Sequence, residues 1–165
     1  MSSIEGKKLA SNIRSKMEEM KTLCKGISEE TASRAPGDRW SPKQIISHLC
    51  GPEGTGLLPA LRLILEQDTP LLDLKPEDPF YTGKRTHMSM AELLEEFEKE
   101  YLGIAALAEG LSEDQLARKA RVPMLKETEL GEYPTLASFL AGLTDFHMDF
   151  HIKHMKEILD ALAKE

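Results

Sequence analysis

Apolar residues recur three or four positions apart over most of this chain, which is the spacing of one face of an α-helix. The first such segment covers about residues 5–25. Its apolar face comprises Leu9, Ile13, Met17, Met20, Cys24 and Ile27. Convincing alternation of apolar and polar residues, the pattern of a half-buried strand, is not found. The pattern therefore predicts an all-α protein.

A second helix is predicted to open at Ser41, a good N-cap residue, and Gln44 three positions later completes a capping box. Pro42 fits the first helical position, where proline is favoured. The helical pattern then meets Gly51-Pro52 and resumes to about residue 67. We therefore expect this helix to be interrupted.

A second capping box, Ser89 with Glu92, starts a third helix. Its apolar residues alternate by four and three positions, which is typical of the seam of a helical bundle. They stand at positions 90, 94, 97, 101, 104, 108 and 111. Ser112 with Gln115 indicates a short helix directly after it.

Residues 119–134 contain two Pro and a Gly in a mixed pattern, and we expect a loop there, with at most a short extended piece. The last helix is predicted from about Thr135 to Ala163. There is no internal repeat and no second core. The chain is therefore expected to form one domain, residues 1–165, folded as a four-helix bundle.

The overall charge argues against one class of partner. The 165 residues are 41% hydrophobic and 30% charged, ordinary values for a globular protein, and the formal net charge is -7. Neutralising nucleic-acid phosphates requires a basic patch, so a nucleic-acid partner is not expected. A small-molecule ligand fits this composition better.

Cys24 and Cys50 are too few and too far apart to form a disulfide framework. The N-terminal segment lacks the apolar core of a signal peptide, and no stretch approaches the roughly 20 apolar residues of a membrane span. We therefore expect a cytoplasmic protein without membrane association.

Two imidazoles interrupt the apolar stripe of the last helix. The stripe comprises Leu136, Leu140, Leu143, His147, Phe150, His151, His154 and Ile158. His147 and His151 are four residues apart, so their rings lie on one face and can converge on one point. Because burying imidazoles without partners is unfavourable, something must satisfy them, and a metal ion is the economical candidate.

A third ligand is available on the second helix. His48 borders the apolar face of that helix and can point into the bundle. Three neutral imidazoles, from His48, His147 and His151, would leave coordination positions open for water or substrate, as in catalytic sites. The alternative is that these are histidines at the edge of the core, bonded to carboxylates or carbonyls.

The other two histidines are expected to have different roles. His154 lies seven residues after His147, about 10 Å along the helix axis, so both can bind one ion only with strained side chains. We expect His154 to line the pocket or support a ligand. His87 precedes a helix and is expected to be solvated.

Residues 51–56 have the glycine spacing of a phosphate-binding loop, but Leu57 and Leu58 stand where Lys and Ser or Thr are required. We interpret the segment as a helix break beside the histidines. Glu53 would then be a polar group in the pocket.

Residues 39–49, RWSPKQIISHL, followed about a hundred residues later by HMDFH at 147–151, resemble the two motifs of the DinB/YfiT superfamily. The resemblance spans about residues 7–158. It implies an up-down-down-up four-helix bundle with one divalent ion held by His48, His147 and His151, and frequent homodimers. Gly51-Pro52 departs from the family pattern, where a continuous helix is expected.

In the family that this chain resembles, the characterised members with activity are transferases, and an isomerase, that use low-molecular-weight thiols. We therefore favour a metal-dependent enzyme of the thiol S-transferase type, with one ion per chain and a low-molecular-weight thiol as co-substrate. A hydrolase is a further possibility for the enzyme class. Imidazole ligands suit Zn or Ni, with Fe or Cu as alternatives.

Two non-catalytic hypotheses stay open on the sequence. One is a bundle that binds a small ligand through the same pocket. The other is a structural or stress-response dimer whose histidines only stabilise the fold.

Overall fold

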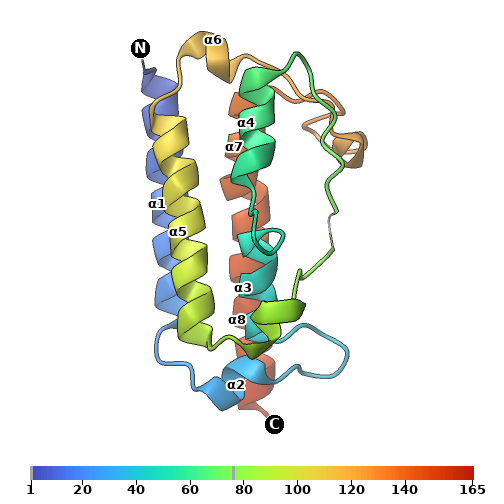
Figure 1. Ribbon diagram of the computed structural model, residues 1–165. Helices are drawn as coiled ribbons and strands as arrows, with labels where there is room; N and C mark the ends of the chain where they lie inside the picture. The colour runs from blue at the N-terminus through green and yellow to red at the C-terminus, as the bar shows by residue number, and fades with distance from the viewer. Residues whose placement is uncertain (1, 76) are drawn as a thin grey trace.

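The computed structural model describes residues 2–75 and 77–165, which form four helical rods lying side by side (Figure 1). The rods are α1 (Ile4–Cys24), α3 (Pro42–Cys50) followed by α4 (Leu58–Glu66), α5 (Met90–Glu109), and α7 (Leu136–Gly142) continued through η3 (Leu143–Met148) into α8 (Asp149–Ala163). Over the described residues, β-structure is limited to two isolated bridges. The predicted all-α four-helix bundle is confirmed.

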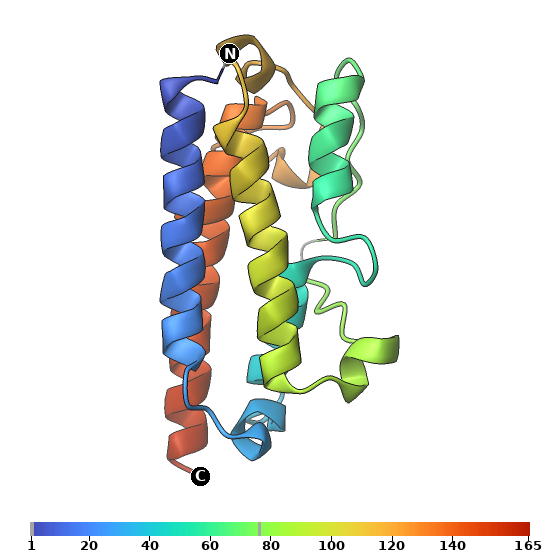
Figure 2. The same ribbon diagram turned by 60° about the vertical axis from the view of Figure 1, so that its left-hand side comes forward.

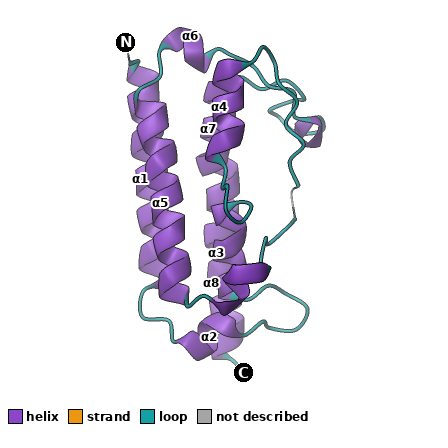
Figure 3. Cartoon of the chain, in the orientation of Figure 1, coloured by secondary structure: helices purple, strands orange, loops and turns teal. Residues whose placement is uncertain are grey.

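Figures 1 and 2 show that α1 and the last rod run from top to bottom, whereas α3–α4 and α5 run from bottom to top. The connection from α4 to α5 must therefore return along the whole rod, and Figure 3 shows it as a long loop on the outside. Short helices punctuate the connections: α2 (Glu29–Ser33), η1 (Gly83–His87), α6 (Glu113–Leu116) and η2 (Pro123–Leu125). No described helix combines the length and apolar character needed to span a bilayer.

The helix starts follow the capping residues of the sequence. At α3, the Gln44 amide N–H donates to Ser41 Oγ at 3.2 Å, and the Ser41 N–H donates to Gln44 Oε1 at 2.8 Å. The same capping box begins α5 at Ser89 and α6 at Ser112. These bonds confirm the three predicted helix starts. The starts could be predicted because each bond joins residues only three positions apart.

The predicted interruption of the second rod is also confirmed. Gly51 ends α3 with φ 75°, a conformation that L side chains rarely adopt. The chain then turns before α4, and a carboxylate from another rod supports the restart: Glu100 Oε1 accepts from the N–H groups of Leu57 and Leu58 at 2.6 and 3.1 Å.

The last rod differs from the single α-helix that the sequence predicts. Residues Leu143–Met148 form a π-helix, whose wider turn rotates everything that follows it. The buried stripe of α8 is His151, Ile152, Met155, Ile158 and Leu162. Phe150, predicted to be on that stripe, is 62% exposed, so this assignment was wrong.

The core between α1 and α5 is apolar. Ile13, Met17 and Met20 from α1 meet Phe97 and Ile104 from α5, and all five are almost completely buried. The two helices therefore pack against each other through an apolar interface.

Candidate metal centre

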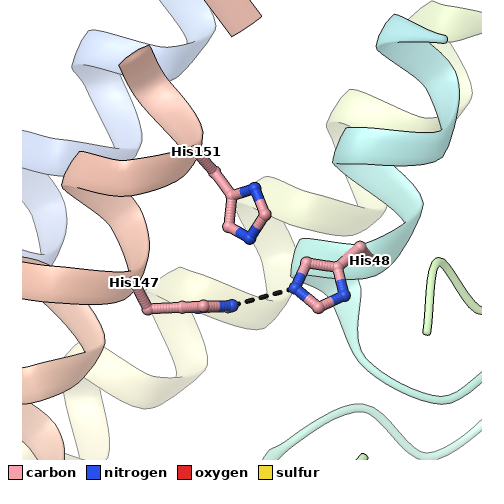
Figure 4. A group of neighbouring side chains, drawn as sticks. All are labelled: His48, His147 and His151. Atoms are coloured by element: carbon pink, nitrogen blue, oxygen red, sulfur yellow. Dashed lines mark hydrogen bonds between the residues drawn. The ribbon is translucent and has the colours of Figure 1, made fainter. Parts of the chain in front are cut away.

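Three histidines from two rods meet inside the bundle (Figure 4). His48 comes from α3, His147 from the π-helix η3 and His151 from α8, and one ring nitrogen of each lies within 4.8 Å of the others. The closest pair is His48 Nε2 and His147 Nε2, at 2.9 Å. The structure thus brings together the three residues that the sequence predicts as ligands.

The separations suit a shared ion. Two nitrogens bound to one ion at about 2.1 Å lie no more than about 4.2 Å apart. The pair at 2.9 Å already meets this limit. The remaining separations are at most 4.8 Å, so the His151 nitrogen needs to move toward the pair by less than about an ångström to meet the limit.

A backbone carbonyl fixes the protonation of His48. Its Nδ1 lies 2.6 Å from the carbonyl oxygen of Asp78. A carbonyl can only accept, so Nδ1 carries the proton and the lone pair of Nε2 faces His147. This is the tautomer and orientation that an Nε2 metal ligand requires.

The other two imidazoles do not find carboxylates or carbonyls in the described part of the chain. His147 Nε2 contacts only His48, and His147 Nδ1 is buried with no hydrogen-bond partner among the described residues. His151 Nδ1 contacts His154 Nδ1 at 3.3 Å. The alternative interpretation is that the histidines are bonded to carboxylates or carbonyls at the edge of the core. Of the three, only His48 has such a partner.

Burial keeps the three rings neutral. It lowers the pKa of His147 to about 4, with a smaller contribution from the charge of His48. It lowers the pKa of His151 to about 2, helped by repulsion from the neighbouring imidazoles. Burial also lowers the pKa of His48, partly offset by the Asp78 carbonyl. Neutral imidazoles have the free lone pairs that metal binding needs.

His154 supports the trio from outside. Since His151 uses Nδ1 toward His154, its Nε2 is the nitrogen that faces His48 and His147. His154 is half-buried and lines the adjoining hollow. His87 is exposed, as predicted.

A hollow of about 380 Å³ opens onto His151 and His154, a volume suited to a small molecule. Its walls are Asp38, Arg39, Trp40, Glu77, Phe150, His151, Lys153, His154 and Glu157. Trp40 links the hollow to the trio, because its ring stacks on His151 with an interplanar angle of 5° and lies 5.2 Å from the His48 ring centroid.

Glu53 does not line this hollow. Its carboxylate accepts from the Lys84 N–H at 3.1 Å, because the turn after Gly51 directs it to η1. The expectation that Glu53 is a polar group of the pocket is corrected accordingly.

Three residues of the site are not predicted from the sequence: Asp78, Phe80 and Arg85. The Phe80 ring stacks on His48 with centroids 6.2 Å apart, and its backbone has φ 50°. All three lie in the long connection before α5, which carries no recognisable motif. Only a proline- and aspartate-containing loop of unusual length marked the region.

The cysteines are unsuited to act as nucleophiles. Cys24 and Cys50 are both buried, and burial raises the pKa of each thiol to about 12. At neutral pH neither is a thiolate, which is the nucleophilic form.

A four-helix bundle with three converging imidazoles defines a class of helical proteins with a candidate mononuclear metal site. The sequence model of the DinB superfamily matches residues 14–160, and the chain belongs to this superfamily. No curated protein matches it significantly.

Among solved structures, the chain is similar to YfiT from Bacillus subtilis, described as a probable metal-dependent hydrolase with an unusual four-helix bundle topology. The TM-score is 0.74 with 20% sequence identity, over 99% of this chain and 90% of that one. At this identity the likeness establishes the shared fold.

Proposed function

We propose that this protein binds one divalent transition-metal ion through His48, His147 and His151 and catalyses attack of an external nucleophile on a small electrophile. The observation that carries the proposal is the convergence of three neutral imidazoles beside an open hollow. Imidazole donors suit Zn or Ni, with Fe as the alternative. A bound ion supplies Lewis acidity, which lowers the pKa of a thiol or of water.

The cysteines do not supply the nucleophile, because the thiols of Cys24 and Cys50 are buried and protonated. The proposal therefore assigns the nucleophile to a co-substrate. A low-molecular-weight thiol is the first candidate, and the reaction is then an S-transfer. The chain's own residues would orient the reactants: Trp40 and Phe150 offer apolar walls, and His154 holds His151 in place.

Water is the second candidate nucleophile, which would make the protein a hydrolase. The similarity to YfiT, described as a probable metal-dependent hydrolase, supports this version. Both versions use the same three imidazoles and the same hollow, and they differ only in the co-substrate.

Metal content of the purified protein is the first test. We expect about one ion per chain, lost in His151→Ala and retained in His87→Ala, which removes an exposed imidazole outside the site. A metal content below about 0.2 ion per chain, unchanged by His151→Ala, contradicts the proposal.

The second test separates the reactions. The metal-loaded protein is incubated with a panel of alkyl halides, epoxides, esters and amides, with and without a low-molecular-weight thiol. Thiol-dependent loss of the electrophile supports S-transfer, and thiol-independent loss supports hydrolysis. A metal-loaded protein inert to the whole panel would favour the non-catalytic ligand-binding or stress-response bundle.

A homodimer and a cytoplasmic location stay predictions. Phe146 and Phe150 are large apolar side chains exposed on the last rod, at 59% and 62%. Sedimentation equilibrium of the full chain, compared with Phe146→Ser, tests whether this surface joins two copies.

A further inference from the structure

Arg85 in η1 is the most completely buried charged side chain near the histidines, with 1% of its side chain exposed. Burying a guanidinium is unfavourable unless its donors are satisfied in good geometry. It forms no hydrogen bond with the three imidazoles, and its Nε is buried without a partner among the described residues. The bonds of Nη1 and Nη2 must therefore account for its position.

Those bonds join three segments. Arg85 Nη1 donates to the carbonyl oxygens of Ser47 at 3.1 Å, Gly51 at 2.5 Å and Phe80 at 3.4 Å. Arg85 Nη2 donates to Glu96 Oε1 on α5 at 2.9 Å. The end of α3, the loop before α5 and α5 itself are therefore held by one side chain.

This cluster continues to the metal centre. Ser47 Oγ donates to the Phe80 carbonyl at 3.0 Å, and the Phe80 N–H donates to Asp78 Oδ1 at 2.8 Å. The Asp78 carbonyl in turn accepts from His48 Nδ1 at 2.6 Å. The acceptor that sets the tautomer of His48 thus belongs to the loop that Arg85 ties to α3.

We propose that Arg85 is a positioning residue for the metal centre: it holds residues 78–80 against the end of α3 and so fixes the ring orientation and tautomer of His48. The acceptor at Asp78 is a backbone carbonyl, which no side-chain substitution can delete. The side chains of Ser47, Asp78 and Arg85 all hold the loop that carries this carbonyl, and Arg85 is the one that also joins it to α5. Its effect on metal affinity rests on the proposed function, whereas its effect on the His48 tautomer does not.

Arg118 provides a matched control. Its Nε donates to the Ile64 carbonyl at 2.7 Å and its Nη2 to the Gln67 carbonyl at 2.8 Å. It therefore binds the C-terminal carbonyls of α4 as Arg85 binds those of α3. None of its bonded groups belongs to the histidine site.

The experiment compares Arg85→Met, Glu96→Gln and Arg118→Met with the unmodified chain. Imidazole ¹⁵N shifts of the metal-free protein should report His48 protonated at Nδ1 in the unmodified chain and in Arg118→Met. Arg85→Met should give averaged shifts of two tautomers, and Glu96→Gln a smaller change in the same direction. Zn²⁺ affinity should fall about tenfold in Arg85→Met, at the low end for residues that support ligands, and stay within about twofold in Arg118→Met.

The outcomes are separable. If Arg85→Met does not fold, Glu96→Gln decides, because its carboxylate is 34% exposed and an amide keeps its shape. If the unmodified chain binds no Zn²⁺, the proposed function fails while the tautomer measurement still decides the role of Arg85. A lower melting temperature with the His48 tautomer and Zn²⁺ affinity unchanged would make Arg85 a structural clamp only and overturn the inference.

Discussion

Between α1 and α5 the buried surface is almost entirely apolar, whereas between α3 and the last rod it carries imidazoles. Ile13, Met17 and Phe97 represent the first interface, and each is nearly or fully inaccessible to solvent. His48 and His151 represent the second, where they are buried with 6% and 5% of their surface exposed. The first interface stabilises the fold, whereas burying imidazoles in the second lowers the free energy of unfolding.

The irregular features of the chain collect on the imidazole side. The π-helix at Leu143–Met148, the break at Gly51, the positive φ of Phe80 and the buried Arg85 all lie within or next to it. Such features persist only when the surrounding structure holds them in place. The regular α1–α5 pair supplies that support, so the two halves should respond differently to substitution.

Phe97→Ala should produce the largest effect. It empties a fully buried position in the α1–α5 interface and should lower the free energy of unfolding by about 3–5 kcal/mol. The three imidazoles lie elsewhere, so the folded fraction should still bind metal with the affinity of the unmodified chain. Urea unfolding and metal titration measure the two quantities. An equal loss of metal affinity would show that the two halves are not separable.

His147→Leu should do the reverse. Removing one of three ligands should weaken metal binding by more than about 100-fold, beyond the range for residues that only support ligands. Stability of the metal-free protein should change little, because two effects oppose each other. Leucine removes an Nδ1 that is buried without a partner among the described residues, but it also removes the bond to His48 Nε2. Calorimetry after chelator treatment checks this, and a large drop in melting temperature would contradict it.

Acid should weaken the imidazole side selectively. In the unfolded chain a histidine has a pKa of about 6.5, whereas burial lowers that of His147 to about 4 and that of His151 to about 2. Below pH 6.5 the unfolded state therefore binds protons that the folded state excludes, and stability falls as pH falls. The loss should be about 1.4 kcal/mol per pH unit for each such histidine.

Urea unfolding of the chelator-treated protein between pH 7 and pH 4.5 measures this slope. His151→Leu removes one of the two strongly shifted groups, so its stability should depend less steeply on pH. The same slope in both proteins would show that His151 is not buried in its neutral form.

Features that depend on residues close together along the chain could be predicted from the sequence. Helix starts at Ser41, Ser89 and Ser112 follow from side chains bonding to backbone groups three residues away. The convergence of His147 and His151 follows from their spacing on one helix. These contacts are local, so pattern alone predicts them.

Features set by contacts between rods could not be predicted in this way. The π-helix changes the rotation of α8. The prediction assumes an ideal α-helical period and therefore places Phe150 on the buried face, where the structure does not have it. The contacts of Asp78 and Arg85 with α3 join residues about thirty or more positions apart within an irregular connection. No periodicity marks such partners.

His154→Gln should have the smallest effect and sharpens the question of what orients His151. The Nδ1–Nδ1 distance of 3.3 Å is longer than the 2.6 Å contact that orients His48, so the imidazole of His154 should contribute less. We expect metal affinity to fall by no more than about tenfold. Glutamine can still donate or accept, so His154→Ala should weaken binding further. If both variants bind metal as the unmodified chain does, the stacked ring of Trp40, tilted by only 5° from His151, is sufficient to hold that ligand.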